Sequence, residues 1–270
     1  MKKTLLAVTL AALTSGAAAT ALAADPKAPA PDFEISGNFA LTSDYRFRGV
    51  SQSNKKPAIQ GGIDFTHNSG FYVGNWNSSV SEWASPLGSG IESDLYAGYS
   101  TELGPVSLDA GFIYYYYANA KVDKTSTSTF NPFNTREIYV GVSYGPFSLK
   151  TSRTMSDRYF GLGKNNDTSL TTDAKGSMYY DLSLEHPLNE KITVTAHAGM
   201  LKLANKTATT KSIYDYSVGI GYDLNGWGLG LAYTTTTGLS TAAKSWFTST
   251  DNQSKALYKS AVAVSLSKTF

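Results

Sequence analysis

Apolar and polar side chains alternate along most of the chain with a period of two residues. In residues 34–48 the odd positions carry side chains such as Ile35 and Phe39, and the even positions carry Asp44 and Arg46. Successive side chains of a β-strand point to opposite sides of the sheet. The pattern therefore predicts one long strand with an apolar face and a polar face.

Eleven further segments alternate in the same way, and together they predict an all-β chain of about twelve strands. The alternation is weak in residues 71–80 and 147–155, where the register is not defined by the sequence. The expected segments are 59–65, 71–80, 92–103, 106–116, 137–144, 147–155, 180–185, 192–198, 214–223, 227–234 and 262–270.

The connections between these segments alternate strictly between short and long. Short turns fall at 67–70, 104–105, 145–146, 187–191 and 225–226, and longer loops fall at 49–57, 81–90, 118–134, 156–177, 204–212 and 237–256. A soluble sandwich also alternates, but its strands are usually only about 5–6 residues long. The asymmetry is typical of a single transmembrane antiparallel up-and-down β-barrel with short periplasmic turns and long extracellular loops. An even number of strands places both termini in the periplasm.

Aromatic residues gather at both ends of the apolar face, as they do at membrane interfaces. Near the long loops we expect Tyr45, Phe47, Tyr114, Tyr116, Tyr180, Tyr214 and Tyr233 to form one girdle. Near the short turns we expect a second girdle of Phe65, Tyr99, Tyr144, Tyr222, Trp227 and Phe270.

The first residues predict export. Lys2 and Lys3 precede a short apolar run, and Ala21-Leu22-Ala23 is a small-x-small cleavage site, so residues 1–23 are expected to be a signal peptide. Residues 24–33 then form a proline-containing periplasmic tail, and 34–270 form the barrel. This organisation predicts a Gram-negative bacterial outer-membrane protein.

Composition excludes several classes. Without Lys2 and Lys3, the 23 basic residues fall to 21, the number of acidic ones, so a nucleic-acid partner is not expected. Cysteine is absent, so a disulfide framework or thiolate metal site is impossible. We find no motif for a cofactor, a phosphate or a metal. The three histidines, His67, His186 and His197, lack an evident nucleophile and acid partner at the lipid face, so an enzyme is not expected.

The last strand resembles the C-terminal signal of outer-membrane barrels. Phe270 ends the chain, and Leu266, Val264 and Val262 precede it at alternate positions, although Lys268 departs from the pattern. The resemblance implies that Phe270 is read by the barrel assembly machinery.

A second resemblance lies in residues 41–53, LTSDYRFRGVSQS, followed by 57–64, PAIQGGID. These residues resemble the TorF family, proteobacterial outer-membrane proteins formerly known only as conserved hypothetical and now grouped as porins. The resemblance implies a porin. Because one fold serves many functions, it does not identify a solute.

The polar face of the strands, if it lines the pore, is mostly acidic. The pore-lining candidates are Asp44, Arg46, Arg48, Asp64, Glu92, Asp94, Glu102, Asp109, Glu137, Asp181, Glu185, Asp215, Asp223 and Lys259. Glu34 and Lys150 fall on the same face. A low-dielectric wall of one charge sign concentrates counter-ions, and carboxylate rings favour cations. We therefore expect a porin for passive diffusion of small hydrophilic solutes or ions, with a preference for cations.

The sequence leaves two interpretations of this charge open. Arg46 and Arg48 beside Asp44 could form a charged constriction, or they could form salt bridges that seal a non-conducting structural or adhesive barrel. Barrels of about eight strands are filled by side chains and those of sixteen or more hold a channel, so twelve is intermediate. A channel for acidic oligosaccharides would favour an arginine-rich wall and is less expected.

The long loops are basic. They contain Lys55, Lys56, Lys121, Lys124, Arg158, Lys164, Lys175, Lys206, Lys211, Lys244 and Lys255. Contact with membrane lipid and with the phosphates of lipopolysaccharide is one interpretation, and ordinary solvated loop charge is the other.

Overall fold

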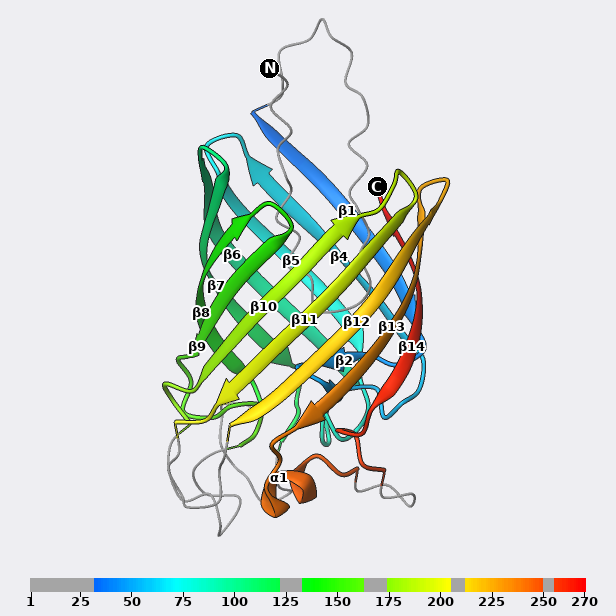
Figure 1. The fold of residues 1–270 in the computed structure, drawn as a ribbon. Helices are drawn as coiled ribbons and strands as arrows, with labels where there is room; N and C mark the ends of the chain where they lie inside the picture. Colours follow the sequence, from blue (N-terminus) through cyan, green and yellow to red (C-terminus); the bar gives the residue numbers. More distant parts are fainter. Residues whose placement is uncertain (1–31, 122–132, 163–173, 205–211, 250–254) are drawn as a thin grey trace, which may run out of the picture.

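A closed antiparallel barrel of twelve strands forms the molecule (Figure 1). The computed structural model describes residues 32–121, 133–162, 174–204, 212–249 and 255–270. The predicted signal peptide and most of the predicted tail lie outside them. The barrel strands are β1 Phe33–Thr42, β4 Ala58–His67, β5 Phe71–Ser79, β6 Ile91–Leu103, β7 Val106–Tyr117, β8 Thr135–Tyr144, β9 Phe147–Thr154, β10 Met178–Pro187, β11 Ile192–Lys202, β12 Ile213–Leu224, β13 Trp227–Thr237 and β14 Ala261–Thr269.

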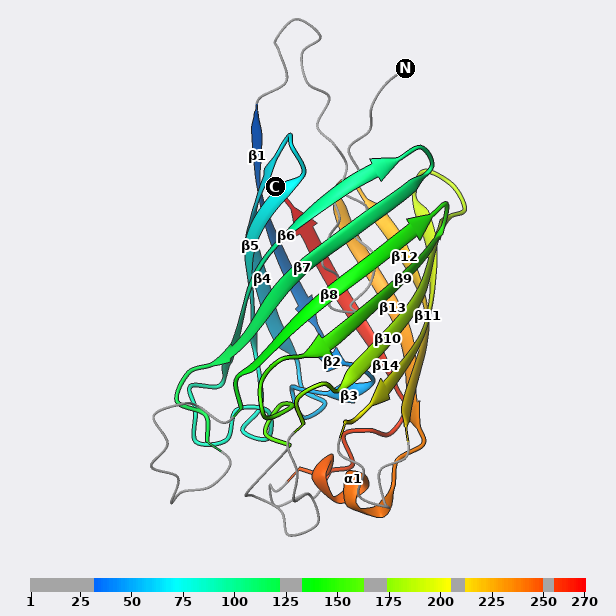
Figure 2. The same cartoon turned by 90° about the vertical axis from the view of Figure 1, so that its left-hand side faces the viewer.

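Each strand pairs with its neighbours in the sequence, and β1 closes the ring against β14. The strands are tilted and wind around the barrel (Figure 2). Both the fold class and the strand count predicted from the alternation are confirmed.

The two ends of the barrel differ as predicted. The short-turn end carries the five tight connections, and at one of them Asn225 and Gly226 both have positive φ, 53° and 82°. This is the combination that a two-residue type I′ hairpin requires. The long-loop end carries the other connections and one short helix, α1 Thr241–Trp246.

The outer surface of the barrel is apolar. Outward side chains such as Ile63, Val140, Val218 and Val264 are more than half exposed. A continuous exposed apolar band around a closed barrel is the surface that a lipid bilayer covers. No helix in the described part of the chain is long and apolar enough to span a membrane.

One strand prediction is wrong. Residues 34–48 do not form a single strand: β1 ends at Thr42, and the chain then turns into the barrel as a small hairpin, β2 Arg46–Phe47 and β3 Val50–Ser51. Tyr45 and Phe47 therefore do not belong to the outer aromatic girdle. Tyr45 is fully buried inside, because the alternation continues past the point where the chain leaves the wall.

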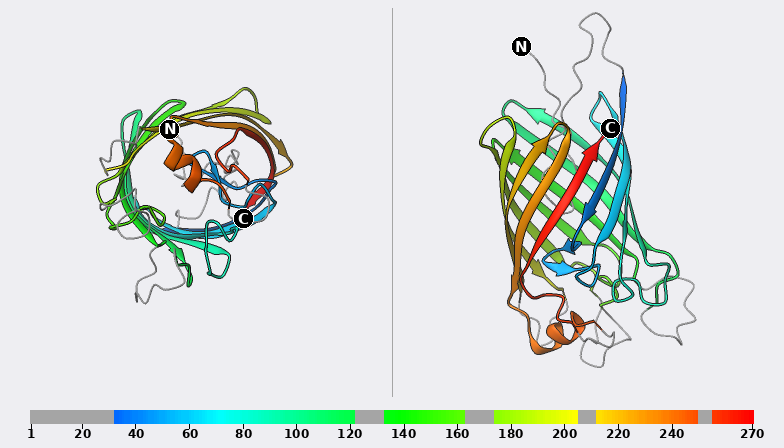
Figure 3. Two further views of the ribbon diagram at one scale, coloured as in Figure 1. Left: turned by 90° about the horizontal axis from the view of Figure 1, so that it is seen from below. Right: turned by 90° about the vertical axis from the view of Figure 1, so that its right-hand side faces the viewer.

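The interior is graded from one end to the other. Inward side chains near the short turns, such as Asp64, Asp109 and Asp223, are partly accessible. Those near the long loops are buried and include two apolar clusters, one around Val50 and Leu257 and one around Tyr115 and Tyr117. Seen from the long-loop end, the β2–β3 hairpin and α1 lie across the opening (Figure 3).

Candidate functional site

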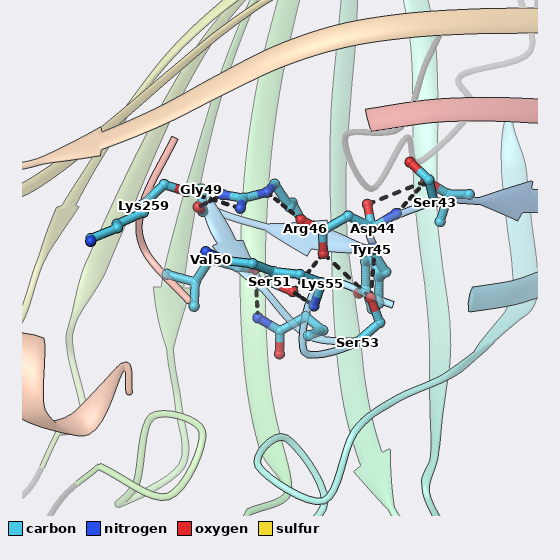
Figure 4. Close-up of polar contacts among 12 residues, drawn as sticks. Ser43, Asp44, Tyr45, Arg46, Gly49, Val50, Ser51, Ser53, Lys55 and Lys259 are labelled. Carbon is cyan, nitrogen blue, oxygen red and sulfur yellow. Dashed lines mark hydrogen bonds and ion pairs between the residues drawn. The ribbon is translucent and has the colours of Figure 1, made fainter. Parts of the chain in front are cut away.

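Residues 43–57, here called the inward segment, cross the lumen at the level of the long-loop half (Figure 4). Asp44 organises this segment: Ser51 Oγ donates to its Oδ1 at 2.5 Å, and Arg46 Nε donates to its Oδ2 at 2.8 Å. The β2–β3 turn lies at Arg48 and Gly49, whose φ values are 47° and 80°. A Cβ at Gly49 would lie 2.6 Å from Cβ of Asp215, so the turn needs glycine for space as well as for conformation.

Arg46 fastens the inward segment to the loop before β14. Its Nη2 donates to the carbonyl oxygen of Lys259 at 2.9 Å, and its Nη1 donates to the carbonyl oxygen of Gly49 at 2.8 Å. The backbone N–H of Ser51 donates to the carbonyl oxygen of Leu257 at 3.1 Å. Lys259 thus enters the network through its backbone.

Arg48 fastens the segment to the opposite wall. Its two terminal nitrogens donate to the two carboxylate oxygens of Glu137 on β8, at 3.0 and 2.7 Å. The guanidinium carbon lies 4.1 Å from the ring centroid of Tyr179 and 4.7 Å from that of Phe47. Arg48 also donates to the hydroxyl of Tyr159, and burial raises the pKa of Tyr159 to about 12.

Tyr45 holds the segment to a third part of the wall. Its hydroxyl donates to Glu92 Oε1 at 3.3 Å, and its ring packs edge-on against Trp76 with a centroid distance of 5.4 Å. Burial, followed by the charge of Glu92, raises the pKa of Tyr45 well above its usual value, so the hydroxyl remains a donor. The segment is therefore anchored to three separate regions of the barrel.

The carboxylates at this level outnumber their cationic partners. Glu92 and Asp94 are 1% and 4% exposed, and Glu92 Oε2 and Asp94 Oδ1 have no hydrogen-bond partner among the described residues. Arg48 is engaged by Glu137, and Arg46 is engaged by Asp44. Two buried carboxyl groups beside the inward segment therefore have no cationic partner among the described side chains.

A second group lies on β10, β11 and β12. His197 bridges two carboxylates, with Nδ1 3.1 Å from Asp181 Oδ1 and Nε2 2.7 Å from Asp215 Oδ2. Tyr179 donates to Asp215 at 3.1 Å. Ser183 lies 3.3 Å from His197, but its hydroxyl donates to Asp181 at 2.6 Å and is therefore not positioned as a nucleophile. The imidazole of His197 therefore links strands β10 and β12 through contacts with two carboxyl groups.

Tyrosines that the sequence analysis did not assign to the interior lie flat along the inner wall. Tyr72 donates to Asp109 at 2.6 Å and shares a hydrogen bond with Tyr139, whose ring lies 4.5 Å from Lys150 Nζ. Tyr96 donates to Asp64.

Inward glycines provide the space for these rings. A Cβ at Gly74 would lie 2.5 Å from Asp64 Oδ1 and against the ring of Tyr96. A sequence signal was present for Tyr96 and Tyr139, which share the parity of the carboxylates on their own strands, whereas the strand of Tyr72 carries no carboxylate.

The structure separates the predicted pore-lining residues into two sets. Near the short turns, partly or fully accessible carboxylates occupy inward positions, together with Glu34; they are Asp64, Glu102, Asp109, Asp181, Glu185 and Asp223. In the long-loop half, the side chains are buried; they are Asp44, Arg46, Arg48, Glu92, Asp94, Glu137 and Asp215. We call the accessible region the acidic vestibule. Among the inward strand positions described there, Lys150 supplies the basic side chain.

The chain matches a known bacterial protein family over nearly its whole length. A family model described as "Bacterial protein of unknown function (Gcw_chp)" matches residues 24–270. The chain belongs to the Gcw_chp family. A search of curated proteins gives no match.

Solved porin structures share the fold of this Gcw_chp chain. A structure of the NanC porin is similar with a TM-score of 0.53 and 11% identity, covering 88% of this chain and 99% of that one. A structure of the KdgM porin gives a TM-score of 0.51 and 10% identity, covering 87% and 99%. KdgM has also been solved with disordered oligogalacturonate, and that structure gives a TM-score of 0.50 at 10% identity, covering 87% and 98%. At these identities the likeness establishes the barrel fold alone.

Proposed function

We propose that the protein is an outer-membrane porin for passive diffusion of small hydrophilic solutes or ions, with a preference for cations. The acidic vestibule carries this proposal. Its accessible carboxylates face one inward lysine among the described residues, and a low-dielectric wall with that balance concentrates cations. The porin fold of the structural neighbours and the resemblance to the TorF family agree with this role. Membership of TorF itself remains a prediction.

The inward segment makes this a gated channel. In the closed arrangement the long-loop half is packed around Arg48 and Glu137, so solutes pass when the segment leaves the lumen. An acidic sugar polymer such as the oligogalacturonate of the KdgM structure would meet a wall of like charge in this barrel, so we propose no such substrate.

The second candidate function is a non-conducting structural or adhesive barrel. The buried Arg48–Glu137 pair favours it, because two hydrogen bonds at 3.0 and 2.7 Å hold the segment across the lumen.

We propose no catalytic role for the Ser183 and His197 pair, because the Ser183 hydroxyl donates its hydrogen bond to Asp181.

Recordings in planar bilayers distinguish the two. We expect discrete conductance steps and, in a salt gradient, a reversal potential of the sign set by cations. Replacing Glu102 and Asp223 with Gln and Asn should reduce that potential. Glu190→Gln is the matched control, because Glu190 is exposed in the turn between β10 and β11. Anion selectivity would refute the cation preference, and an absence of steps at all voltages would favour the second candidate.

Outer-membrane placement also implies two partners. Assembly by the barrel assembly machinery remains a prediction from Phe270, which is 67% exposed and exchanges backbone hydrogen bonds with Gly37 at 2.8 and 3.2 Å. Contact with membrane lipid follows from the apolar outer band.

A further inference from the structure

Three basic side chains point outward from the wall at the long-loop end. They are Arg136 on β8, Arg153 on β9 and Lys202 at the end of β11, and all three are exposed. Their strand neighbours Glu137, Thr154 and Leu201 are buried inside. Because side chains alternate between the faces of a strand, the three cations lie on the lipid side. We call them the basic patch.

Strand register places the three cations together. Met178 on β10 is the register partner of both Arg153 and Lys202, so one strand separates these two cations. Arg153 also pairs with Ile138, two residues from Arg136. Opposite residues in a sheet are roughly 5 Å apart and diagonal ones about 7–8 Å, so the backbone places Arg153 about 7–8 Å from Arg136 and roughly 10 Å from Lys202.

The surroundings of the patch define what it can bind. None of the outward-facing positions on strands β7–β12 carries an acidic side chain, whereas outward tyrosines such as Tyr114 and Tyr180 lie beside or below the patch. Cations on the lipid face are costly in the hydrocarbon layer but not at its boundary. Aromatic residues mark that boundary, so the patch lies at headgroup level.

We propose that the basic patch binds the phosphate groups of lipopolysaccharide, the glycolipid of the outer leaflet. This rests on the proposed outer-membrane placement, which directs the long-loop end to the cell exterior. Arginine matches phosphate through two parallel hydrogen bonds, and two arginines with one lysine suit a headgroup that carries more than one phosphate. A single phosphate of a glycerophospholipid would engage only part of the patch.

The folded protein in detergent is titrated with purified lipopolysaccharide, with the same glycolipid after phosphatase treatment, and with phosphatidylglycerol vesicles. The triple variant Arg136→Gln, Arg153→Gln, Lys202→Gln should bind lipopolysaccharide at least about tenfold more weakly, because each lost charge-assisted bond is worth roughly that factor. Phosphatase treatment should weaken binding to the wild type similarly. Lys268→Gln is the matched control: Lys268 is outward and stacks on Trp227 and Phe270 at the short-turn end.

Equal affinity of the triple variant and the wild type would overturn the proposal, as would equally tight binding to phosphatidylglycerol. If the triple variant does not fold, the three single substitutions replace it, and an unchanged affinity in all three overturns the proposal. Conductance of the same variants separates this outcome from the porin function. The patch lies outside the lumen, so ion selectivity should stay unchanged whether or not lipopolysaccharide binds.

Discussion

Arg48→Ala tests the link between the inward segment and channel opening. The substitution removes both hydrogen bonds to Glu137 and the contacts with the Tyr179 and Phe47 rings, while Glu137 stays 1% exposed with no cationic partner. The anchors at Tyr45 and Arg46 remain. The closed state of the variant therefore contains an unpaired buried carboxylate.

Removing one partner of a buried ion pair costs about 3–5 kcal/mol. Withdrawal of the segment lets water reach Glu137 and relieves that cost, so the penalty acts on the balance between closed and open states. Since each 1.4 kcal/mol is a factor of ten, this balance should shift toward the open state by roughly 10²- to 4 × 10³-fold.

Single-channel recordings measure the open probability, and urea unfolding in detergent measures stability. We expect Arg48→Ala to open far more often than the wild type and to unfold at lower urea. Arg48→Lys keeps the charge but loses the two-point geometry, so its behaviour should be intermediate. Adding Glu137→Gln to Arg48→Ala should recover part of the stability, because the carboxylate left unpaired by the loss of Arg48 is then replaced by a neutral amide. If Arg48→Ala leaves both open probability and unfolding unchanged, the pair does not hold the segment in place.

Two further substitutions test the interior. Asp94→Asn should raise the free energy of unfolding by about 1–3 kcal/mol, because it replaces one of two neighbouring buried carboxyl groups that have no cationic partner among the described residues; a urea titration checks this, and an unchanged or lower stability would contradict it. Gly199→Ala should lower the unfolding free energy by about 1–3 kcal/mol, since its Cβ would lie 2.5 Å from Asp215 Oδ1 and against the Tyr179 hydroxyl. Gly141→Ala is its matched control, because a Cβ there meets nothing nearer than 3.8 Å; equal effects of the two alanines would contradict the steric reason.

The strands and turns could be predicted because lipid imposes a strict rule on one face of every strand. Twelve alternating segments separated by short and long connections can close in few ways, and the register of β5, undefined in the sequence, follows once β4 and β6 are fixed on either side. The observed type I′ turn at Asn225 and Gly226 is encoded locally.

The entry of the inward segment into the lumen could not be predicted from alternation. A two-residue alternation shows that the two faces of a segment differ in polarity. It does not show that both faces lie inside the barrel, as they do at Asp44 and Tyr45. One signal was present: a strand of fifteen residues exceeds the roughly 9–11 that a tilted transmembrane strand needs. The pairing of Arg48 with Glu137 spans 89 positions in the sequence, and nothing local to either residue specifies it.

The inward segment also bears on how the ring is held shut. β1 and β14 are joined by five residue pairs, whereas β1 and β4 are joined by ten. The segment extends this short seam from within, because Ser43 donates to the carbonyl oxygen of Val264 at 2.8 Å and Arg46 reaches Lys259. Any movement that withdraws the inward segment from the lumen therefore also breaks hydrogen bonds that support the join between β1 and β14.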